Sequence, residues 1–318
     1  MDRPVVGVIG RTVDKLDRIR PALEAHFDTN MPPLRIEENG SDRDEILGEA
    51  SVLLSSGIKE ADLPLASELS WVQALSAGVD SYPLEALKEY EVLLTNVSGV
   101  HAEPIAQQVL GYMLVFERRI HDGMAQQRNG EWESYQGGEL GDHTLGILGV
   151  GAIGTRVAEL GSALGMSVAG VKRDPNDAPA VLDECYGPND LDELLSQSTY
   201  LVIACPLTNE TRGMIGAEEL KALPSESVLV NIARGAVVDE AALIDALQGN
   251  VIRGAALDVF EEEPLPSDSP LRTMDNVIMT PHMAGSTPHY YDRAIRIFAE
   301  NYRSFAAGEL DKMCNRII

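Results

Sequence analysis

The sequence predicts an α/β protein with parallel sheets, and three observations lead to this fold class. Short, continuous apolar runs alternate with segments of helical character, as expected for parallel strands that are buried on both faces. A glycine-rich run follows one of these strands near the middle of the chain. The 318 residues also exceed the size at which one core usually stops growing, so we expect two domains.

Four apolar runs in the first part of the chain predict strands: Val5 to Ile9, Val52 to Leu54, Trp71 to Leu75 and Val92 to Leu94. The segments between them supply crossovers, which need about a dozen residues each. From Glu103 to about Arg128, apolar residues recur at helical spacing. We therefore expect one long helix to connect the two domains.

The second part repeats the alternation and contains six predicted strands. These are Leu145 to Leu148, Val168 to Val171, Tyr200 to Ala204, Val228 to Ile232, Ala255 to Val259 and Val277 to Met279. Six strands suit a doubly wound dinucleotide-binding fold. Helical periodicity from Thr287 to Phe305 then predicts that the chain returns to the first domain, which is discontinuous.

The composition is strongly acidic, with 50 Asp and Glu against 25 Lys and Arg and a formal net charge of −25. This charge argues against nucleic acid and anionic membranes as partners. The acidic residues are spread along the chain, so we expect them to cover a folded surface that is screened at molar salt. The composition favours a salt-adapted protein of the haloarchaeal kind; the alternative is an ordinary acidic protein.

No signal segment and no run of about 18 apolar residues is present, so a cytoplasmic protein is expected. Cys185, Cys205 and Cys314 have neither disulfide-framework nor zinc-site spacing. His101 and Glu103 are metal ligands by type, but their spacing favours a helix start. We expect no metal site.

The glycine-rich run Gly149, Gly151 and Gly154, with Ala152 and Ile153 between them, follows a predicted strand and precedes a helical pattern. In a dinucleotide-binding turn, the first glycine permits the tight turn and the second lets the backbone approach a pyrophosphate. The third allows close packing of helix and strand. The run alone is a weak signal, but its context predicts a dinucleotide site.

Ligands of open α/β sheets lie beyond the carboxyl ends of the strands. Arg234, Glu263 and His282 each follow a predicted strand of the second part, and an arginine, a carboxylate and a histidine could converge there. Each has a simpler alternative: Arg234 as a surface cation, Glu263 as part of the solvated run Glu261 to Glu263, and His282 as a structural histidine.

The motifs TLGILGVGAIG, CPLTNET, NIARGAVVDE, ALDVFEEEPLP and TPHMAG occur in the order and spacing of the D-isomer-specific 2-hydroxyacid dehydrogenases, which the whole chain resembles. LSAGVDSYP near residue 80 and HAEPIAQQVLGYM from His101 extend the resemblance. It implies a Rossmann coenzyme domain inserted into a flavodoxin-like substrate domain, and a homodimer. The implied substrate domain is 1–102 and 287–318, and the dinucleotide-binding domain is 103–286.

The resemblance also implies roles for individual residues. Arg234 matches the arginine that binds the substrate carboxylate and polarises its carbonyl, and His282 matches the acid/base. Glu263 matches the carboxylate that favours the imidazolium form of His282. Ala77 and Gly78 match the loop whose N–H groups hold the substrate carboxylate. The expected cofactor contacts are the glycine turn with Ala152 and Ile153, Lys172, Arg173, Cys205, Pro206, Thr211, Ile232, Ala233, Arg234, Asp258 and His282.

The end of the second strand of the coenzyme domain reads Gly170-Val171-Lys172-Arg173, where NAD-preferring members carry an acidic residue. Two cations suit a 2′-phosphate, so we expect NADP to be preferred and NAD to be secondary. The alternative is that both cations face solvent and that Asp174 binds the ribose.

A small 2-ketoacid is the expected substrate, with Ser55, Ser56, Gly57 and Leu75 near its side chain. Rival functions are a glyoxylate or hydroxypyruvate reductase, and a nucleotide-sensing protein like the corepressors of this fold. Trp132 and Tyr135 are expected in the core or at a dimer interface, and Gln107 replaces the glutamate common in the family.

Overall fold

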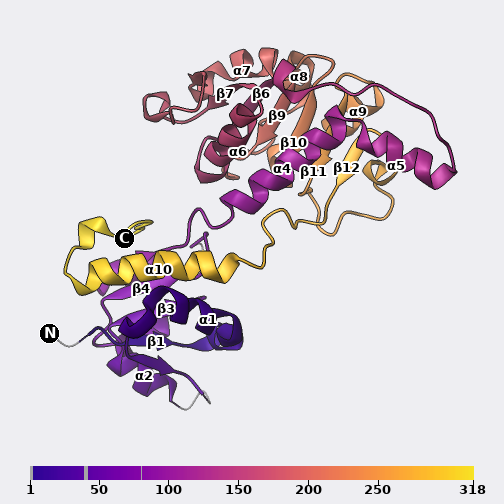
Figure 1. Ribbon diagram of the computed structural model, residues 1–318. Helices are drawn as coiled ribbons and strands as arrows, with labels where there is room; N and C mark the ends of the chain where they lie inside the picture. The colour runs from indigo at the N-terminus through magenta and orange to yellow at the C-terminus, as the bar shows by residue number, and fades with distance from the viewer. Residues whose placement is uncertain (1–2, 39–41, 80) are drawn as a thin grey trace. The chain divides into compact units, whose positions relative to one another are not determined.

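The computed structural model describes residues 3–38, 42–79 and 81–318 and divides the chain into two compact units (Figure 1). Unit 1 comprises Met1–Val100 and Thr287–Ile318, and unit 2 comprises His101–Ser286. Asp80, within the LSAGVDSYP motif, lies outside the described residues. No helix in the described part of the chain combines the length and the apolar character that a membrane span requires.

Unit 1 is built on a five-stranded parallel sheet in the order β2-β1-β3-β4-β5. The strands are β1 (Val6–Val8), β2 (Leu34–Ile36), β3 (Val52–Ser55), β4 (Trp71–Ala74) and β5 (Leu93–Thr95). This is the strand order of flavodoxin, and it confirms the predicted fold of this part of the chain.

Helices cover both faces of this sheet (Figure 1). One face packs against α1 (Leu16–Phe27) and α10 (Tyr290–Ala306), and the other packs against α2 (Arg43–Glu49) and α3 (Leu84–Glu89). Phe298 of α10 is fully buried and contacts Phe27 edge-on, with ring centroids 5.8 Å apart. The last segment of the chain therefore completes the core of unit 1.

Unit 2 is built on a seven-stranded parallel sheet in the order β12-β11-β10-β9-β6-β7-β8. Its strands are β6 (Thr144–Leu148), β7 (Ser167–Val171), β8 (Glu184–Tyr186), β9 (Tyr200–Ile203), β10 (Val228–Asn231), β11 (Gly254–Leu257) and β12 (Val277–Met279). Counted from β6, the order is the 3-2-1-4-5-6 of dinucleotide-binding domains with a seventh strand added. The Rossmann prediction is confirmed.

One face of the unit 2 sheet packs against α4 (Ala102–Glu117) and α6 (Ala152–Ala163). The other face packs against α7 (Leu191–Gln197), α8 (Ala217–Ala222) and α9 (Glu240–Gln248). The remaining helix, α5 (Ile120–Asn129), has no buried residue. Where the chain enters and leaves unit 2, the ring nitrogen Nδ1 of His101 lies 3.1 Å from the carbonyl oxygen of Gly285.

The structure corrects two expectations about secondary structure. The single long helix expected over Glu103 to Arg128 is two helices, because Arg119 adopts the left-handed conformation with φ of 54° between α4 and α5. The strands β2 and β8 were not expected. Both are three-residue edge strands without a fully buried residue, so they lack the continuous apolar run that reveals a central strand.

Candidate functional site

The glycine turn between β6 and α6 has the geometry that a pyrophosphate requires. Gly149 has φ of 103°, and a Cβ atom there would lie 2.6 Å from the backbone nitrogen of Cys205. A Cβ at Gly154 would lie 2.3 Å from the carbonyl oxygen of Gly149, whereas one at Gly151 would meet nothing within 4 Å. Gly149 and Gly154 are therefore fixed by close packing, and the space in front of Gly151 is open at the N-terminus of a helix.

Beyond β7, the two predicted cations differ in their surroundings. The ammonium group of Lys172 lies 2.6 Å from a carboxylate oxygen of Asp177, an exposed ion pair that lowers the pKa of Asp177. Arg173 is exposed and makes no hydrogen bond or ion pair within the part of the chain that the structure describes. The carboxylate of Asp174 caps the turn at Asn176 by accepting its N–H at 3.0 Å. Of the two cations beside the expected ribose position, Lys172 is paired with Asp177, whereas the guanidinium N–H groups of Arg173 have no partner among the described residues.

Two further loops at the carboxyl edge carry expected cofactor contacts. After β9, Cys205 is buried and Pro206 is exposed, and the hydroxyl of Thr211 closes the loop by donating to the carbonyl of Pro206 at 2.7 Å. After β10, Ile232 and Ala233 are both buried. Because all strands of this sheet are parallel, these loops lie on the same edge as the glycine turn.

The loop that carries Arg234 is held by a side chain and by close backbone packing. The amide of the buried Asn231, the last residue of β10, donates to the carbonyl of Arg234 at 3.1 Å and accepts from the N–H of Ala233 at 3.1 Å. A Cβ at Gly235 would lie 1.9 Å from the carbonyl carbon of Phe260. The Arg234 loop therefore packs directly on the backbone that leads to Glu263.

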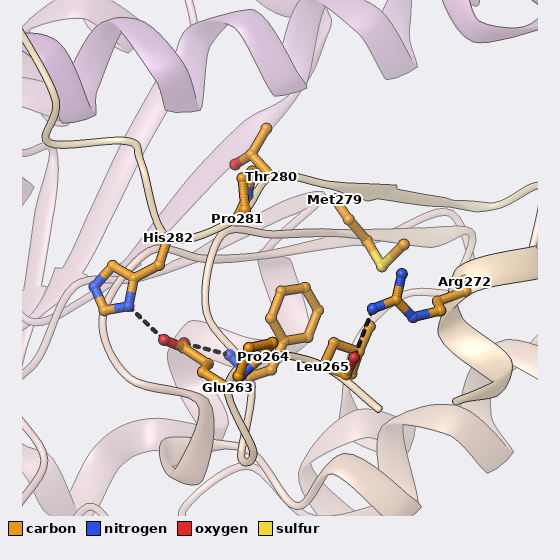
Figure 2. A pocket seen from close by; sticks show the side chains of 9 residues that line it. Glu263, Pro264, Leu265, Arg272, Met279, Thr280, Pro281 and His282 are labelled. Carbon is orange, nitrogen blue, oxygen red and sulfur yellow. Dashed lines mark hydrogen bonds and ion pairs between the residues drawn. The ribbon is translucent and has the colours of Figure 1, made fainter. Parts of the chain in front are cut away.

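His282 and Glu263 form a hydrogen-bonded pair (Figure 2). The ring nitrogen Nδ1 of His282 lies 2.7 Å from the carboxylate oxygen Oε2 of Glu263, and the other carboxylate oxygen accepts the N–H of Phe260 at 3.0 Å. The His282 side chain is 50% exposed, and Nε2 is the ring nitrogen that the bond to Glu263 leaves unused. Glu263, rather than Glu261 or Glu262, is the member of the acidic run that contacts the histidine.

The environment of Glu263 keeps it ionised. Burial by itself would raise the pKa of this carboxyl group, but hydrogen bonds from His282 and the N–H of Phe260, and the charges of His282 and Arg234, lower the pKa below its ordinary value. The contribution of Arg234 shows that its guanidinium lies close enough to Glu263 to act on that carboxylate electrostatically.

Asp258, directly after β11, is 2% exposed, and its carboxylate already accepts three hydrogen bonds. The oxygen Oδ1 accepts from the hydroxyl of Thr280 at 2.5 Å and the N–H of Met283 at 2.8 Å, and Oδ2 accepts from the N–H of Ala284 at 2.9 Å. A carboxylate offers about four acceptor sites. Oδ2 therefore has one acceptor site that these three bonds do not use.

A cavity of about 490 Å³ adjoins the His282–Glu263 pair (Figure 2). Its lining is mainly apolar, with a carboxylate, a guanidinium, a hydroxyl and an imidazole among the side chains: Phe260, Glu263, Pro264, Leu265, Arg272, Met279, Thr280, Pro281 and His282. The guanidinium of Arg272 is already bound to backbone, since it donates to the carbonyls of Leu265 at 2.5 Å and Pro266 at 2.9 Å.

In unit 1, side chains hold the carbonyl groups of the predicted carboxylate-binding loop. Asn96 donates to the carbonyl of Ala77 at 2.6 Å, Ser76 donates to that of Gly78 at 2.7 Å, and Tyr290 donates to that of Leu75 at 2.7 Å. The N–H groups of Ala77 and Gly78 have no backbone acceptor among the described residues. Two adjacent free N–H groups suit an anion.

The segment after β3, expected near the substrate side chain, is closed by its own bonds. The Ser55 hydroxyl is buried and donates to the carbonyl of Gly57 at 2.6 Å. The N–H of Ser56 donates to the hydroxyl of Thr12 at 2.8 Å.

The structure also places the residues about which the sequence was ambiguous. Glu103 accepts hydrogen bonds from Gln107 at 2.6 Å and from Arg156 at 2.7 Å, which gives Gln107 a structural role. In the described part of the chain, no group of three His, Cys, Asp or Glu residues could hold a metal ion.

Two aromatic residues were expected in the core or at a dimer interface. Trp132 is 99% exposed, so a core role is wrong for it. The guanidinium carbon of Arg119 lies 5.1 Å from the centre of the Tyr135 ring.

Three residues of the site were not predicted: Asn231, Gly235 and Thr280. Asn231 and Thr280 lie at the ends of strands, where the sequence shows a polar residue but not its partner. Gly235 follows Arg234 directly, and a glycine there signals a close backbone approach, although the approaching segment is known only from the structure.

A Rossmann sheet with an open glycine turn and an acid–base pair at its carboxyl edge, together with a flavodoxin-like unit, defines a two-domain dinucleotide-dependent oxidoreductase. The family model for the NAD-binding domain of D-isomer specific 2-hydroxyacid dehydrogenases matches residues 110–284. The chain is 35% identical to glyoxylate/hydroxypyruvate reductase B of Serratia proteamaculans over 280 residues, which covers 85% of each protein. It therefore belongs to the D-isomer specific 2-hydroxyacid dehydrogenase family, whose members are NAD(P)-dependent and act on CH–OH groups.

Other relatives support the same family. The chain is 38% identical over 250 residues to D-3-phosphoglycerate dehydrogenase of Methanocaldococcus jannaschii, which covers 77% of this chain but only 47% of the length of that relative. A crystal structure of the D-isomer specific 2-hydroxyacid dehydrogenase from Xanthobacter autotrophicus, in complex with NADPH and MES, matches with a TM-score of 0.80 and 33% identity, covering 99% of this chain and 98% of that one.

Proposed function

We propose that this protein reduces 2-ketoacids to D-2-hydroxyacids, with NADP(H) preferred and NAD(H) as the secondary cofactor. The observation that carries the proposal is the His282–Glu263 pair, 2.7 Å apart, at the carboxyl edge of the sheet that also bears the glycine turn. A histidine with one ring nitrogen held by a carboxylate and the other left unused by that bond is arranged for proton transfer.

Each catalytic residue has one role in this proposal. His282 donates its Nε2 proton to the substrate carbonyl oxygen during reduction and removes the hydroxyl proton during oxidation. Glu263 stabilises the imidazolium form through Nδ1, and its lowered pKa keeps it ionised for this task. Arg234 binds the substrate carboxylate and polarises the carbonyl. The bound nicotinamide cofactor supplies the hydride.

The proposed cofactor contacts are the residues at the carboxyl edge of unit 2. The open space in front of Gly151 fits a pyrophosphate, and the N-terminus of α6 favours its charge. The remaining contacts are Ala152, Ile153, Lys172, Arg173, Cys205, Pro206, Thr211, Ile232, Ala233 and Asp258. The free guanidinium of Arg173 and the ammonium of Lys172 support a 2′-phosphate ligand, and the NADPH complex of the Xanthobacter relative is consistent with this preference.

We further propose that the N–H groups of Ala77 and Gly78 bind the substrate carboxylate. The three bonds that hold the carbonyls of their loop leave these N–H groups available. On this basis unit 1 is the substrate domain and unit 2 is the coenzyme domain.

A second candidate is a glyoxylate or hydroxypyruvate reductase on the same scaffold. The Serratia relative carries that name, and the match covers 85% of this chain. The two candidates share the acid/base pair and differ only in the substrate side chain.

The test is NADPH and NADH oxidation at molar KCl with a panel of 2-ketoacids that includes glyoxylate and hydroxypyruvate, followed by chiral analysis of the products. We expect turnover with at least one 2-ketoacid, a D-configured product and a higher kcat/KM for NADPH than for NADH. His282→Ala should lower kcat about 10²- to 10⁴-fold with cofactor binding retained. Cofactor binding without turnover of any ketoacid would instead support a nucleotide-sensing protein.

We also propose a cytoplasmic homodimer that uses α5 and the segment after it. This helix has no buried residue, and Ile120, Met124 and Trp132 are exposed apolar side chains on the same stretch. Sedimentation analysis of the protein and of Trp132→Ser should show a dimer that the substitution weakens. A monomeric wild-type protein would contradict this assembly.

A further inference from the structure

Tyr112 of α4 is hydrogen-bonded to the segment that leads to His282. Its hydroxyl forms a short hydrogen bond with the hydroxyl of Thr280. Thr280 in turn donates to Oδ1 of Asp258 at 2.5 Å. Tyr112 and Asp258, the two ends of this chain of three groups, are 3% and 2% exposed, whereas Thr280 between them is partly buried and lines the cavity.

The chemistry of the groups fixes the direction of this chain. An ionised carboxylate only accepts hydrogen bonds, so the Thr280 hydroxyl uses its single proton for Asp258. The Thr280 oxygen must therefore accept its other bond from the Tyr112 hydroxyl. Burial raises the pKa of Tyr112, which keeps that hydroxyl protonated.

The backbone that follows Thr280 depends on Asp258. The N–H groups of Met283 and Ala284 donate to its two carboxylate oxygens, and the N–H of His282 donates to its carbonyl at 2.8 Å. His282 itself has φ of 50°, a left-handed conformation that is uncommon for a residue with a side chain. Such a conformation persists only where the surroundings hold it in place.

We infer that Tyr112 is a positioning residue for the proposed reaction: through Thr280 it orients the Asp258 carboxylate, which holds the 282–284 backbone and thereby aims the His282 imidazole. The inference rests on the proposed function for the role of His282.

The test compares Tyr112→Phe, which removes only the terminal hydroxyl, with Thr280→Val, with Thr280→Ser and with the double variant Tyr112→Phe/Thr280→Val. Tyr302→Phe is the matched control, since Tyr302 is 4% exposed and its hydroxyl donates to the carbonyl of Pro4 at 2.7 Å in the other unit. We expect Tyr112→Phe to lower kcat about 5- to 20-fold with the KM for NADPH within about twofold, and Tyr302→Phe to leave both unchanged.

Two further readouts separate positioning from simple stabilisation. If the three groups act as one chain, the double variant loses no more activity than Thr280→Val alone, and Thr280→Ser retains activity. Hydrogen exchange of the Met283 and Ala284 amides should accelerate in Tyr112→Phe and Thr280→Val but not in Tyr302→Phe. Unchanged exchange and unchanged kcat in Tyr112→Phe, or losses that multiply in the double variant, would overturn the inference.

The exchange measurement keeps the two proposals distinguishable. A wild-type protein without ketoacid turnover contradicts the proposed function. Accelerated exchange in Tyr112→Phe in that same protein would still confirm that the tyrosine holds the loop. Normal turnover in the wild type with no effect of Tyr112→Phe on exchange or kcat would overturn the positioning role alone.

Discussion

Replacing Tyr200 by Phe tests the buried charge cluster at the amino-terminal edge of the unit 2 sheet. Tyr200 is fully buried, and its hydroxyl donates to the carboxylate of Glu117 at 2.6 Å. Glu117 is 4% exposed, and its other neighbours are His143 at 3.2 Å and Arg253 at 3.6 Å. The substitution keeps the ring and removes one hydrogen bond to a buried charge.

A hydrogen bond to a charged group contributes about 1.5–3 kcal/mol, and the remaining bonds of Glu117 are unchanged. We expect the free energy of unfolding of Tyr200→Phe to fall by this amount. For a unit of this size, each kcal/mol lowers Tm by about 2–4 °C. The expected decrease is therefore about 3–12 °C.

Urea unfolding at constant KCl, followed by circular dichroism, measures this difference. Tyr186→Phe is the control, because its hydroxyl also contacts a glutamate, Glu184, but at the exposed surface. We expect its effect to stay below about 0.5 kcal/mol. Equal effects of the two substitutions would refute the claim that burial gives the Tyr200 bond its strength.

The pH dependence gives an independent check. Burial alone would raise the pKa of Glu117, but hydrogen bonds from Tyr200 and His143 and the charges of His143 and Arg253 lower this pKa below its ordinary value in the folded protein. A carboxyl group with a lowered folded pKa stabilises the fold above its unfolded pKa, and this contribution is lost as pH falls through the folded pKa. The difference between wild type and Tyr200→Phe should be full above about pH 5 and shrink below about pH 4.

Three other predictions concern the site and the surface. Gly235→Ala should abolish activity and lower the free energy of unfolding, because its Cβ would lie 1.9 Å from the carbonyl carbon of Phe260. The control is Gly111→Ala, which should be tolerated because a Cβ there would meet nothing within 4 Å. An active Gly235→Ala variant would contradict the close packing. Asp177→Asn should remove the negative charge paired with Lys172, while the backbone carbonyl of residue 177 still accepts from the ammonium, and so raise the NADPH-to-NADH ratio of kcat/KM about twofold; an unchanged ratio would contradict a competition between Asp177 and the 2′-phosphate for Lys172. Because the net charge is −25, Tm should rise between 0.1 M and 2 M KCl, and a Tm independent of salt would contradict the proposed salt adaptation.

The sequence revealed the central strands of both sheets, because each is a continuous apolar run between polar segments. It did not reveal β2 and β8, whose edge positions require little burial. The break between α4 and α5 was also hidden, since Arg119 adopts its left-handed conformation without a glycine or proline to mark it. Apolar runs in a sequence indicate which segments are buried, whereas the two edge strands and the break between α4 and α5 depend on tertiary contacts.

For the site, the sequence indicated the candidate catalytic residues but not the contacts that hold them. Glu263 was ambiguous within three consecutive glutamates until the structure showed its bond to His282. Tyr112 fits the apolar pattern of its helix, and nothing in that pattern reveals that its hydroxyl meets Thr280 from 168 residues away. Contacts over such sequence separations follow from strand order, which apolar runs alone do not determine.

The bond between His101 and Gly285 has a consequence for how this protein can be recombined. It joins the first residue of unit 2 to the last-but-one, so the 101–286 segment begins and ends at one point. A compact unit whose ends are adjacent is suited to exchange as a single block, and we expect the 101–286 segment to be exchangeable between members of the family. Exchanging it at these two positions would transfer Arg173, Glu263 and His282, the proposed cofactor and acid/base residues, together and would leave the Ala77–Gly78 loop, the proposed carboxylate-binding loop, unchanged.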